Sequence, residues 1–236
     1  MHPLAPMDRP ATDARPRERT RPAVPGKVAM QRVISAYRDP VVRSYSWGRF
    51  KIFRQRFLDE IGQYLPSEGR VLDIGCGFGL FSLYYAQLHP GLSLHGFDLD
   101  ARRVEMARDA ARTLGLTNAT FHVQNATDLR AHERFDAIYM LDVVHHVPAP
   151  AVEALLREVK ASLAPGGVLL VKELDTEPAW QRLFAHALDL AMSPSSPPRY
   201  WSTAELGGLL ARLGFDVKRH AMVDILPYPH VLYVNR

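Results

Sequence analysis

Three glycines spaced two residues apart, Gly75, Gly77 and Gly79, follow a short apolar run that begins at Val71. Glycine has no Cβ, so a turn built from these residues brings backbone N–H groups close to a ligand at the start of a helix. The spacing is G-x-G-x-G and differs from the G-x-G-x-x-G of dinucleotide-binding folds. The run therefore indicates ligand binding at a strand-to-helix turn. A tight turn in some other nucleotide-binding fold is the alternative.

Two aspartates define the chemistry of this turn. Asp73 lies two residues before Gly75, where a carboxylate would repel a pyrophosphate but would suit a cationic ligand. Asp98 ends the next apolar run, where an acidic side chain can accept hydrogen bonds from both hydroxyls of a ribose. Cys76, the single cysteine, lies between two glycines and is interpreted as a small packing residue, not as a nucleophile.

A pair of histidines, His145 and His146, follows the apolar run that ends at Leu141. Imidazole titrates near neutral pH and suits general-base chemistry. We predict His146 as the base and His145 as the second candidate; the alternative is that the histidines cap the following loop or pack below a bound cofactor. A metal site formed by Asp142, His145 and Glu173 is conceivable, but ligands scattered in this way are usually structural or solvated, so none is predicted.

Short strands alternating with amphipathic helices must position these residues. The predicted strands are 70–74, 92–98, 120–124, 135–141 and 167–173, and the helices between them are 79–88, 101–114 and 151–163. This alternation predicts a parallel sheet covered by helices on both faces. Helices at 180–192 and 203–213 follow, and then strands at 215–223 and 230–234. The link between these last two strands is short, which predicts an antiparallel pair.

The remaining segments are a tail, a cap and an insertion. Residues 1–27 are rich in proline and arginine and have little apolar surface to bury, so they are predicted to be a disordered tail. A transit peptide is the alternative, which the prolines and acidic residues disfavour. Residues 28–66 are predicted to form a helical cap, because apolar residues recur at three- and four-residue steps. Residues 67–236 form the predicted core, with a substrate-side insertion at 176–201.

The net charge of +4 is concentrated in the tail, which holds six basic and three acidic residues. The rest of the chain is nearly balanced, which argues against a nucleic-acid partner. No apolar run reaches the roughly 18 residues that cross a membrane, although the basic run at 38–56 would allow peripheral contact with a membrane surface. A single cysteine fits a reducing compartment, so we predict a cytoplasmic protein. The oligomeric state is left open.

The run VLDIGCGFG followed by HGFDLD resembles the first two motifs of the class I S-adenosylmethionine-dependent methyltransferases. The order of the predicted elements extends the resemblance over residues 67–236. It implies S-adenosylmethionine as the cofactor. It also implies an α/β, Rossmann-like fold, with seven strands in the order 3-2-1-4-5-7-6 and helices on both faces. The sheet is then mostly parallel, with the last strand antiparallel.

The resemblance further implies a set of cofactor-binding residues. They are Asp73, Gly75, Cys76, Gly77 and Gly79 in the first motif, Asp98 and Leu99 in the second, Asn125 and Ala126 after the third strand, and Leu141 at the end of the fourth. Asn125 stands where the family usually has an acid that contacts the adenine amino group, and its carbonyl can accept the same bond. Ala126 would offer its N–H to the adenine ring, and Leu141 would lie near the methionine part.

The resemblance is closest to small-molecule methyltransferases of quinone and natural-product biosynthesis. We therefore expect methyl transfer to a small organic acceptor, lipid-like or aromatic, with O-methylation first and C-methylation second. The Asp/Asn-Pro-Pro-aromatic motif of amino-methylating relatives does not occur after the fourth strand. The alternatives are N-methylation of a small amine or a protein, and a non-catalytic cofactor-binding scaffold. Turnover of the cofactor would separate an enzyme from a scaffold.

Overall fold

The computed structural model describes residues 22–53, 55–176, 199–222 and 230–236. These residues form a seven-stranded sheet in the order β3-β2-β1-β4-β5-β7-β6, which confirms the predicted order. The strands are β1 (Glu68–Ile74), β2 (Gly91–Asp98), β3 (Ala119–Val123), β4 (Phe135–Leu141), β5 (Leu163–Leu174), β6 (Val217–Ala221) and β7 (His230–Asn235). β1 to β5 are parallel, and β7 is antiparallel to both β5 and β6. The carboxyl ends of β1 to β5 therefore meet at one edge.

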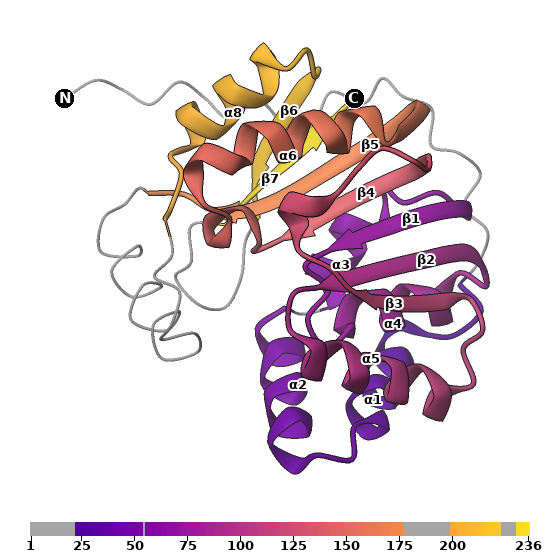
Figure 1. Cartoon of the computed structure of the whole chain (residues 1–236). Helices are drawn as coiled ribbons and strands as arrows, with labels where there is room; N and C mark the ends of the chain where they lie inside the picture. Colours follow the sequence, from indigo (N-terminus) through magenta and orange to yellow (C-terminus); the bar gives the residue numbers. More distant parts are fainter. Residues whose placement is uncertain (1–21, 54, 177–198, 223–229) are drawn as a thin grey trace.

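Helices cover both faces of this sheet (Figure 1). α6 (Ala149–Ala161) and α8 (Thr203–Arg212) lie over one face. Over the other lie α4 (Leu80–Leu88) and α5 (Ala101–Leu114), with the N-terminal helices α1 (Gly26–Ala36), α2 (Pro40–Ile52) and α3 (Gln55–Gly62). Two short 3-10 turns, η1 (Ala126–Asp128) and η2 (Val144–His146), follow β3 and β4. The helix predicted at 180–192 lies outside the described residues.

Alternation along β1 divides its side chains between two apolar cores. Val71 is buried in the core on the side of α4 and α5, whereas Leu72 and Ile74 are buried on the side of α6 and α8. Successive side chains of a strand point to opposite faces, so Asp73 lies on the same side as Val71. A carboxyl group is thereby placed in the first core, beneath α4.

The N-terminal helices contribute to the same core. Phe50, Phe57 and Ile61 are all buried in it. α2 begins where the Asp39 side chain accepts hydrogen bonds from the N–H groups of Val41 and Val42 at 2.8 and 3.3 Å. None of the described helices is long and apolar enough to cross a bilayer.

Two boundaries differ from the sequence-based expectation. α1 begins at Gly26, inside the segment predicted as tail, and the N–H of Ala23 already donates to the Leu88 carbonyl at 3.0 Å. β5 begins at Leu163, before the predicted start at 167, because Leu163 pairs with Phe135 ahead of an irregularity in the register. Both differences reflect backbone pairing with distant segments, which local sequence does not reveal.

Candidate cofactor and acceptor site

The glycine-rich turn joins β1 to α4 at the edge where the parallel strands end. Gly75, Gly77 and Gly79 all have positive φ angles, of 75°, 53° and 77°. A Cβ on Gly75 would lie 2.5 Å from a methyl group of Val143, so glycine is required there by contact as well as by conformation. A Cβ on Gly77 would meet nothing within 4 Å. The space over Gly77 is therefore open to a ligand that approaches the backbone closely.

Asp98 lies beside this open space, at the end of β2. One carboxylate oxygen accepts the N–H of Gly77 and the other accepts the N–H of Asp100, both at 2.9 Å. A carboxylate has about four acceptor positions, so it can also take hydroxyl donors from a ligand. Leu99, the next residue, is 68% exposed, which offers an apolar surface next to the carboxylate. This arrangement fits the ribose and base of S-adenosylmethionine.

Asp73 lies under the turn rather than in the open space. Its carboxyl is 3% exposed and accepts hydrogen bonds from the Ser82 hydroxyl at 2.7 Å and from the Tyr139 hydroxyl at 3.1 Å. Burial raises the pKa of Asp73 to about 7, against the lowering effect of these two hydroxyls, and the nearby Asp98 adds to the increase. The bonds that the structure gives Asp73 are thus internal, and a role toward a cationic ligand stays a prediction.

Cys76 is packed below the same turn. It is 8% exposed, and a Cβ on Gly96 would come within 3.0 Å of the Cys76 Cβ. Burial raises the pKa of the Cys76 thiol, and Asp73 and Asp98 raise it further. The thiolate is therefore disfavoured, which agrees with the interpretation of Cys76 as a packing residue.

The third and fourth strands bring three more predicted residues to this edge. Asn125 and Ala126 follow β3, where the Asn125 side-chain oxygen accepts the N–H of Thr127 at 3.1 Å and caps η1. The N–H of Gln124 donates to the Asp98 carbonyl at 3.0 Å, which ties this segment to the end of β2. Leu141 ends β4 and is 8% exposed. Parallel pairing thus gathers residues from four strands around one space.

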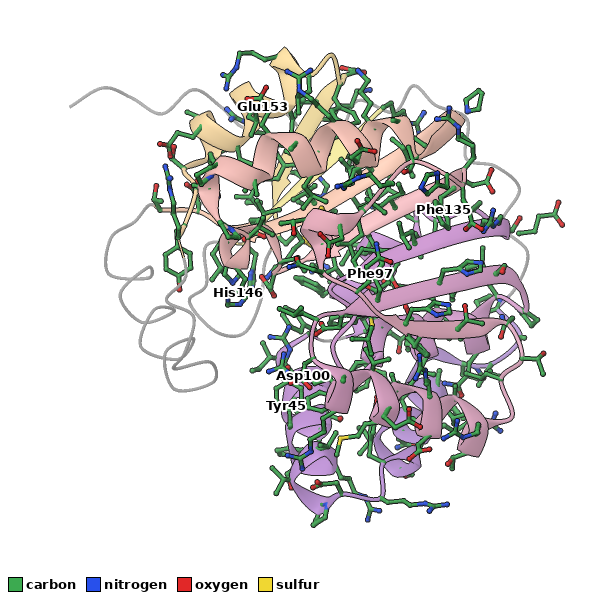
Figure 2. The ribbon with its side chains drawn as sticks, viewed as in Figure 1. Tyr45, Phe97, Asp100, Phe135, His146 and Glu153 are labelled. Carbon is green, nitrogen blue, oxygen red and sulfur yellow. The ribbon has the colours of Figure 1, made fainter. Side chains whose placement is uncertain are left out.

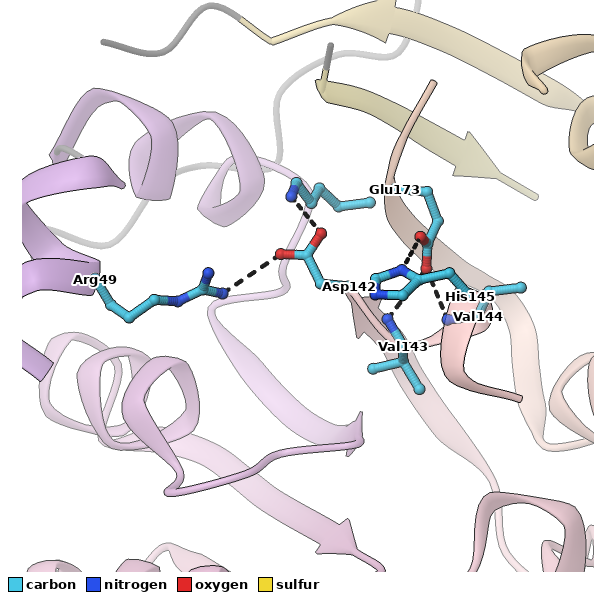
Figure 3. Close-up of polar contacts among 7 residues, drawn as sticks. Arg49, Asp142, Val143, Val144, His145 and Glu173 are labelled. Carbon is cyan, nitrogen blue, oxygen red and sulfur yellow. Dashed lines mark hydrogen bonds and ion pairs between the residues drawn. The ribbon is translucent and has the colours of Figure 1, made fainter. Parts of the chain in front are cut away.

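Asp142 follows β4 with a φ of 59°, and among the described residues it is the only non-glycine with positive φ. Its carboxylate lies between two cations, because it accepts from Lys172 of β5 and from Arg49 of α2, the second of which is labelled in Figure 3. The Arg49 guanidinium lies 3.4 Å from it. Burial would raise the pKa of Asp142, but Lys172 and then Arg49 outweigh that effect and hold the pKa below its ordinary value. Burial in turn lowers the pKa of Lys172, although Asp142 opposes the shift.

The two predicted histidines have different surroundings. His145 is 3% exposed, and its Nδ1 lies 2.6 Å from a carboxylate oxygen of Glu173. His146 is exposed and lies at the sheet edge (Figure 2). The two rings are neighbours, with centroids 4.1 Å apart. Among the described residues, no group of three or more His, Cys, Asp or Glu side chains could hold a metal ion.

The structure brings further residues to this region. Tyr37, between α1 and α2, donates from its hydroxyl to the Phe78 carbonyl in the glycine-rich turn at 2.7 Å, and the Tyr45 ring contacts Phe78 edge-on. Arg49 belongs to the basic run at 38–56 and was not expected at this turn, and Lys172 was assigned no role from the sequence. The one available signal was the pair of charged residues, Lys172 and Glu173, at the end of an otherwise apolar strand.

Comparison with known proteins identifies the family. Residues 48–220 match the family model described as "Methyltransferase domain". The match covers more than half of the chain, which therefore belongs to this family. Together with the fold, this makes the protein a class I S-adenosylmethionine-dependent methyltransferase, an enzyme with S-adenosylmethionine as its cofactor.

Curated relatives narrow the comparison. The chain is 36% identical over 116 residues to a ubiquinone biosynthesis O-methyltransferase of Xanthomonas axonopodis pv. citri (strain 306), matching 48% of this chain and 46% of that protein. It is 40% identical over 170 residues to the ubiquinone biosynthesis O-methyltransferase of Cereibacter sphaeroides (strain ATCC 17025 / ATH 2.4.3), matching 67% and 66%. The matched region thus spans between about half and two thirds of these relatives.

Solved structures support the fold. The magnesium protoporphyrin IX methyltransferase of Synechocystis PCC 6803, with bound SAH, superimposes with a TM-score of 0.63 at 21% identity, covering 89% of this chain and 94% of that one. An O-methyltransferase family protein from Burkholderia thailandensis gives a TM-score of 0.65 at 19% identity, covering 77% and 55%. At these identities the likeness concerns the fold alone.

Proposed function

We propose that this methyltransferase transfers the methyl group to an oxygen of a small organic acceptor, aromatic or lipid-like. The observation that carries the proposal is the exposed His146 imidazole at the end of β4, on the same sheet edge as the glycine-rich turn. Relatives named as ubiquinone biosynthesis O-methyltransferases support an oxygen acceptor. The chain spans only part of those relatives, so their substrate is not carried over.

The cofactor half of the site is assigned to backbone groups and one carboxylate. Asp98 accepts the ribose hydroxyls, and the open backbone at Gly77 approaches the methionine part. Leu99 packs against the adenine ring, while Asn125 and Ala126 meet its polar edge. Gly75 and Gly79 shape the turn, Cys76 packs below it, and Leu141 closes the space beside the methionine part.

The acceptor half is assigned to the turn after β4 and to the cap. When bound, S-adenosylmethionine supplies an electrophilic methyl group on a sulfonium, with a neutral thioether as leaving group. A ring nitrogen of His146 would accept the proton of the acceptor hydroxyl as that oxygen takes the methyl group. The helices of the predicted cap, 28–66, are proposed to enclose the acceptor above the core at 67–236, whereas most of the predicted insertion at 176–201 lies outside the described residues.

A turnover assay tests the reaction. Formation of S-adenosylhomocysteine is followed with a panel of phenols and catechols, and with matched amines and anilines as controls. We expect turnover with hydroxyl acceptors and methyl ethers as products. N-methylated products, or cofactor binding without turnover of any acceptor, would instead favour the amine-methylating or the scaffold alternative.

A substitution tests the base. His146→Ala should lower turnover by about 10²–10³-fold, the usual contribution of general-base catalysis, while cofactor affinity measured by titration changes little. Substitution of the exposed His132, on the loop before β4, is the matched control and should leave turnover unchanged. A His146→Ala variant as active as the His132→Ala variant would reject the base assignment but leave the methyltransferase standing.

A further inference from the structure

Glu173 of β5 is a buried carboxylate that receives three hydrogen bonds from one short turn. Its Oε1 accepts the N–H of Val144 at 2.7 Å and the N–H of Val143 at 3.1 Å, and its Oε2 lies 2.6 Å from Nδ1 of His145 (Figure 3). The residue is 3% exposed. Backbone N–H groups buried without a partner are costly. The Glu173 carboxylate removes this cost in the turn after β4, because it accepts the N–H groups of Val143 and Val144.

The same bonds set the proton on the neighbouring imidazole. An ionised carboxylate only accepts, so Nδ1 of His145 carries the proton in the 2.6 Å bond to Glu173. The bond made by one ring nitrogen decides the state of the other, so in the neutral ring Nε2 is the nitrogen without the proton. The His145 ring in turn lies against His146, with centroids 4.1 Å apart. A change at Glu173 is therefore transmitted to the predicted base.

β5 holds this turn from both faces. Lys172 and Glu173 are consecutive, so their side chains point to opposite sides of the strand. Lys172 pairs with Asp142 at the start of the turn, on the side of the Phe53 ring, 5.1 Å away. Glu173 binds the next three residues on the other side. The positive φ of Asp142 is a conformation that L residues rarely adopt, and these contacts stabilise it.

We propose that Glu173 is a positioning residue for methyl transfer: it fixes the turn at Val143–His145 and the Nδ1–H form of His145, and so presents His146 to the acceptor. The inference rests on the proposed function, because it concerns the turn that carries the predicted base. It assigns Glu173 no contact with substrate or cofactor.

Replacing one oxygen by an amide nitrogen separates the two roles of Glu173. In Glu173→Gln the amide oxygen can still accept the Val143 and Val144 N–H groups. The amide NH2 then faces Nδ1 of His145, which must accept, so the imidazole proton moves to Nε2. Glu158→Gln is the matched control, because Glu158 of α6 also accepts a backbone N–H, that of Ala131 at 3.1 Å.

Three readouts are expected to differ between these variants. Using the phenol turned over fastest in the acceptor panel, kcat should fall at least about tenfold in Glu173→Gln, part of what general-base catalysis contributes, with little change in KM or in cofactor affinity. Nitrogen-15 shifts of the histidine rings should show the tautomer of His145 reversed. Melting temperature should stay within a few degrees of the Glu158→Gln variant.

A truncation completes the test without needing an acceptor. Glu173→Ala should expose the Val143 and Val144 amides to rapid hydrogen exchange, whereas Glu173→Gln should keep them protected. Unchanged kcat in Glu173→Gln beside a large loss in His146→Ala would overturn this inference and leave the proposed function intact. Loss of kcat in Glu173→Gln with full activity in His146→Ala would overturn the base assignment and, with it, the inference that Glu173 acts by presenting His146. An unchanged His145 tautomer in Glu173→Gln would overturn the inference directly.

Discussion

One aspartate lies just before the glycine-rich turn and another starts the turn after β4, and the surroundings of the two carboxyls differ. Asp73 is the last residue but one of β1, which pairs with β4, and it faces two hydroxyls, those of Ser82 and Tyr139. Asp142 faces two cations, Lys172 and Arg49. Burial opposes ionisation in both, yet the pKa of Asp73 is raised to about 7 while that of Asp142 is lowered. Hydroxyl donors only moderate the cost of burial, whereas paired cations reverse it.

This difference matches the chemistry assigned to each region. The cofactor is a cation, and the carboxyl groups of Asp73 and Asp98 lie beside the turn that is proposed to receive it; in the described residues no lysine, arginine or histidine bonds to Asp73. The turn after β4 is proposed to hold a base in a fixed place; its Asp142 carboxylate is paired with the Lys172 ammonium, and Glu173 is bonded to groups of the turn itself. Asp73, on the cofactor side, therefore has no bonded cation among the described residues, whereas the charged groups of the turn after β4 are bonded to other groups of the protein.

The largest expected effect comes from removing a cation at Asp142. Lys172→Met keeps most of the apolar stem near Phe53 but leaves Asp142 with Arg49 as its described cation. Breaking a buried pair typically costs about 3–5 kcal/mol, so we expect the free energy of unfolding, measured with urea at pH 7, to fall by about that amount. The loss should shrink at low pH. In the variant the pKa of Asp142 should rise, as burial raises that of Asp73, so the carboxyl is neutralised by a proton as the pH falls.

Two controls sharpen this prediction. The double variant Lys172→Met/Asp142→Asn should recover most of the lost stability, because asparagine tolerates positive φ and carries no charge. Lys160→Met removes a lysine whose ammonium donates to the Leu213 carbonyl, and it should cost less. Equal losses in Lys172→Met and Lys160→Met would mean that pairing Lys172 with Asp142 stabilises the protein no more than the hydrogen bond from Lys160 to the Leu213 carbonyl.

The two regions also differ in how much of them could be predicted from the sequence. β1, the glycine turn and the start of α4 are contiguous, so one local pattern revealed the cofactor side and the strand order of the family. The Arg49–Asp142 and Lys172–Asp142 contacts join residues 93 and 30 positions apart. No local spacing encodes such pairs, so the sequence pointed to the histidines, and to Asp142 and Glu173 only as conceivable metal ligands, but not to the cations that hold the turn.

A smaller effect is expected at Asp98, on the cofactor side. Asp98→Ala removes the acceptor proposed for the ribose hydroxyls, a loss of about 1.5–3 kcal/mol in cofactor binding. Titration calorimetry should therefore show at least a several-fold weaker affinity for S-adenosylmethionine. Asp98→Asn should lose less, because its amide oxygen can still accept the Gly77 N–H seen at 2.9 Å. Unchanged affinity in Asp98→Ala would reject the ribose assignment.

The smallest effect is expected in the pH dependence of stability that Asp73 causes. It tests the difference in pKa between Asp73 and Asp142. Its pKa is about 7 in the folded protein against an ordinary value of 3.8, so the folded state binds the proton more tightly than the unfolded state. The stability that this proton contributes is fully present below pH 3.8 and is lost as pH rises through about 7. Between pH 6 and pH 8 the wild type should lose about 1 kcal/mol relative to Asp73→Asn, which keeps an acceptor for Ser82 and Tyr139 but cannot ionise. Urea unfolding of both proteins across this range measures the difference. Parallel stability curves would show that Asp73 is ionised throughout, and that the pKa contrast with Asp142 does not hold.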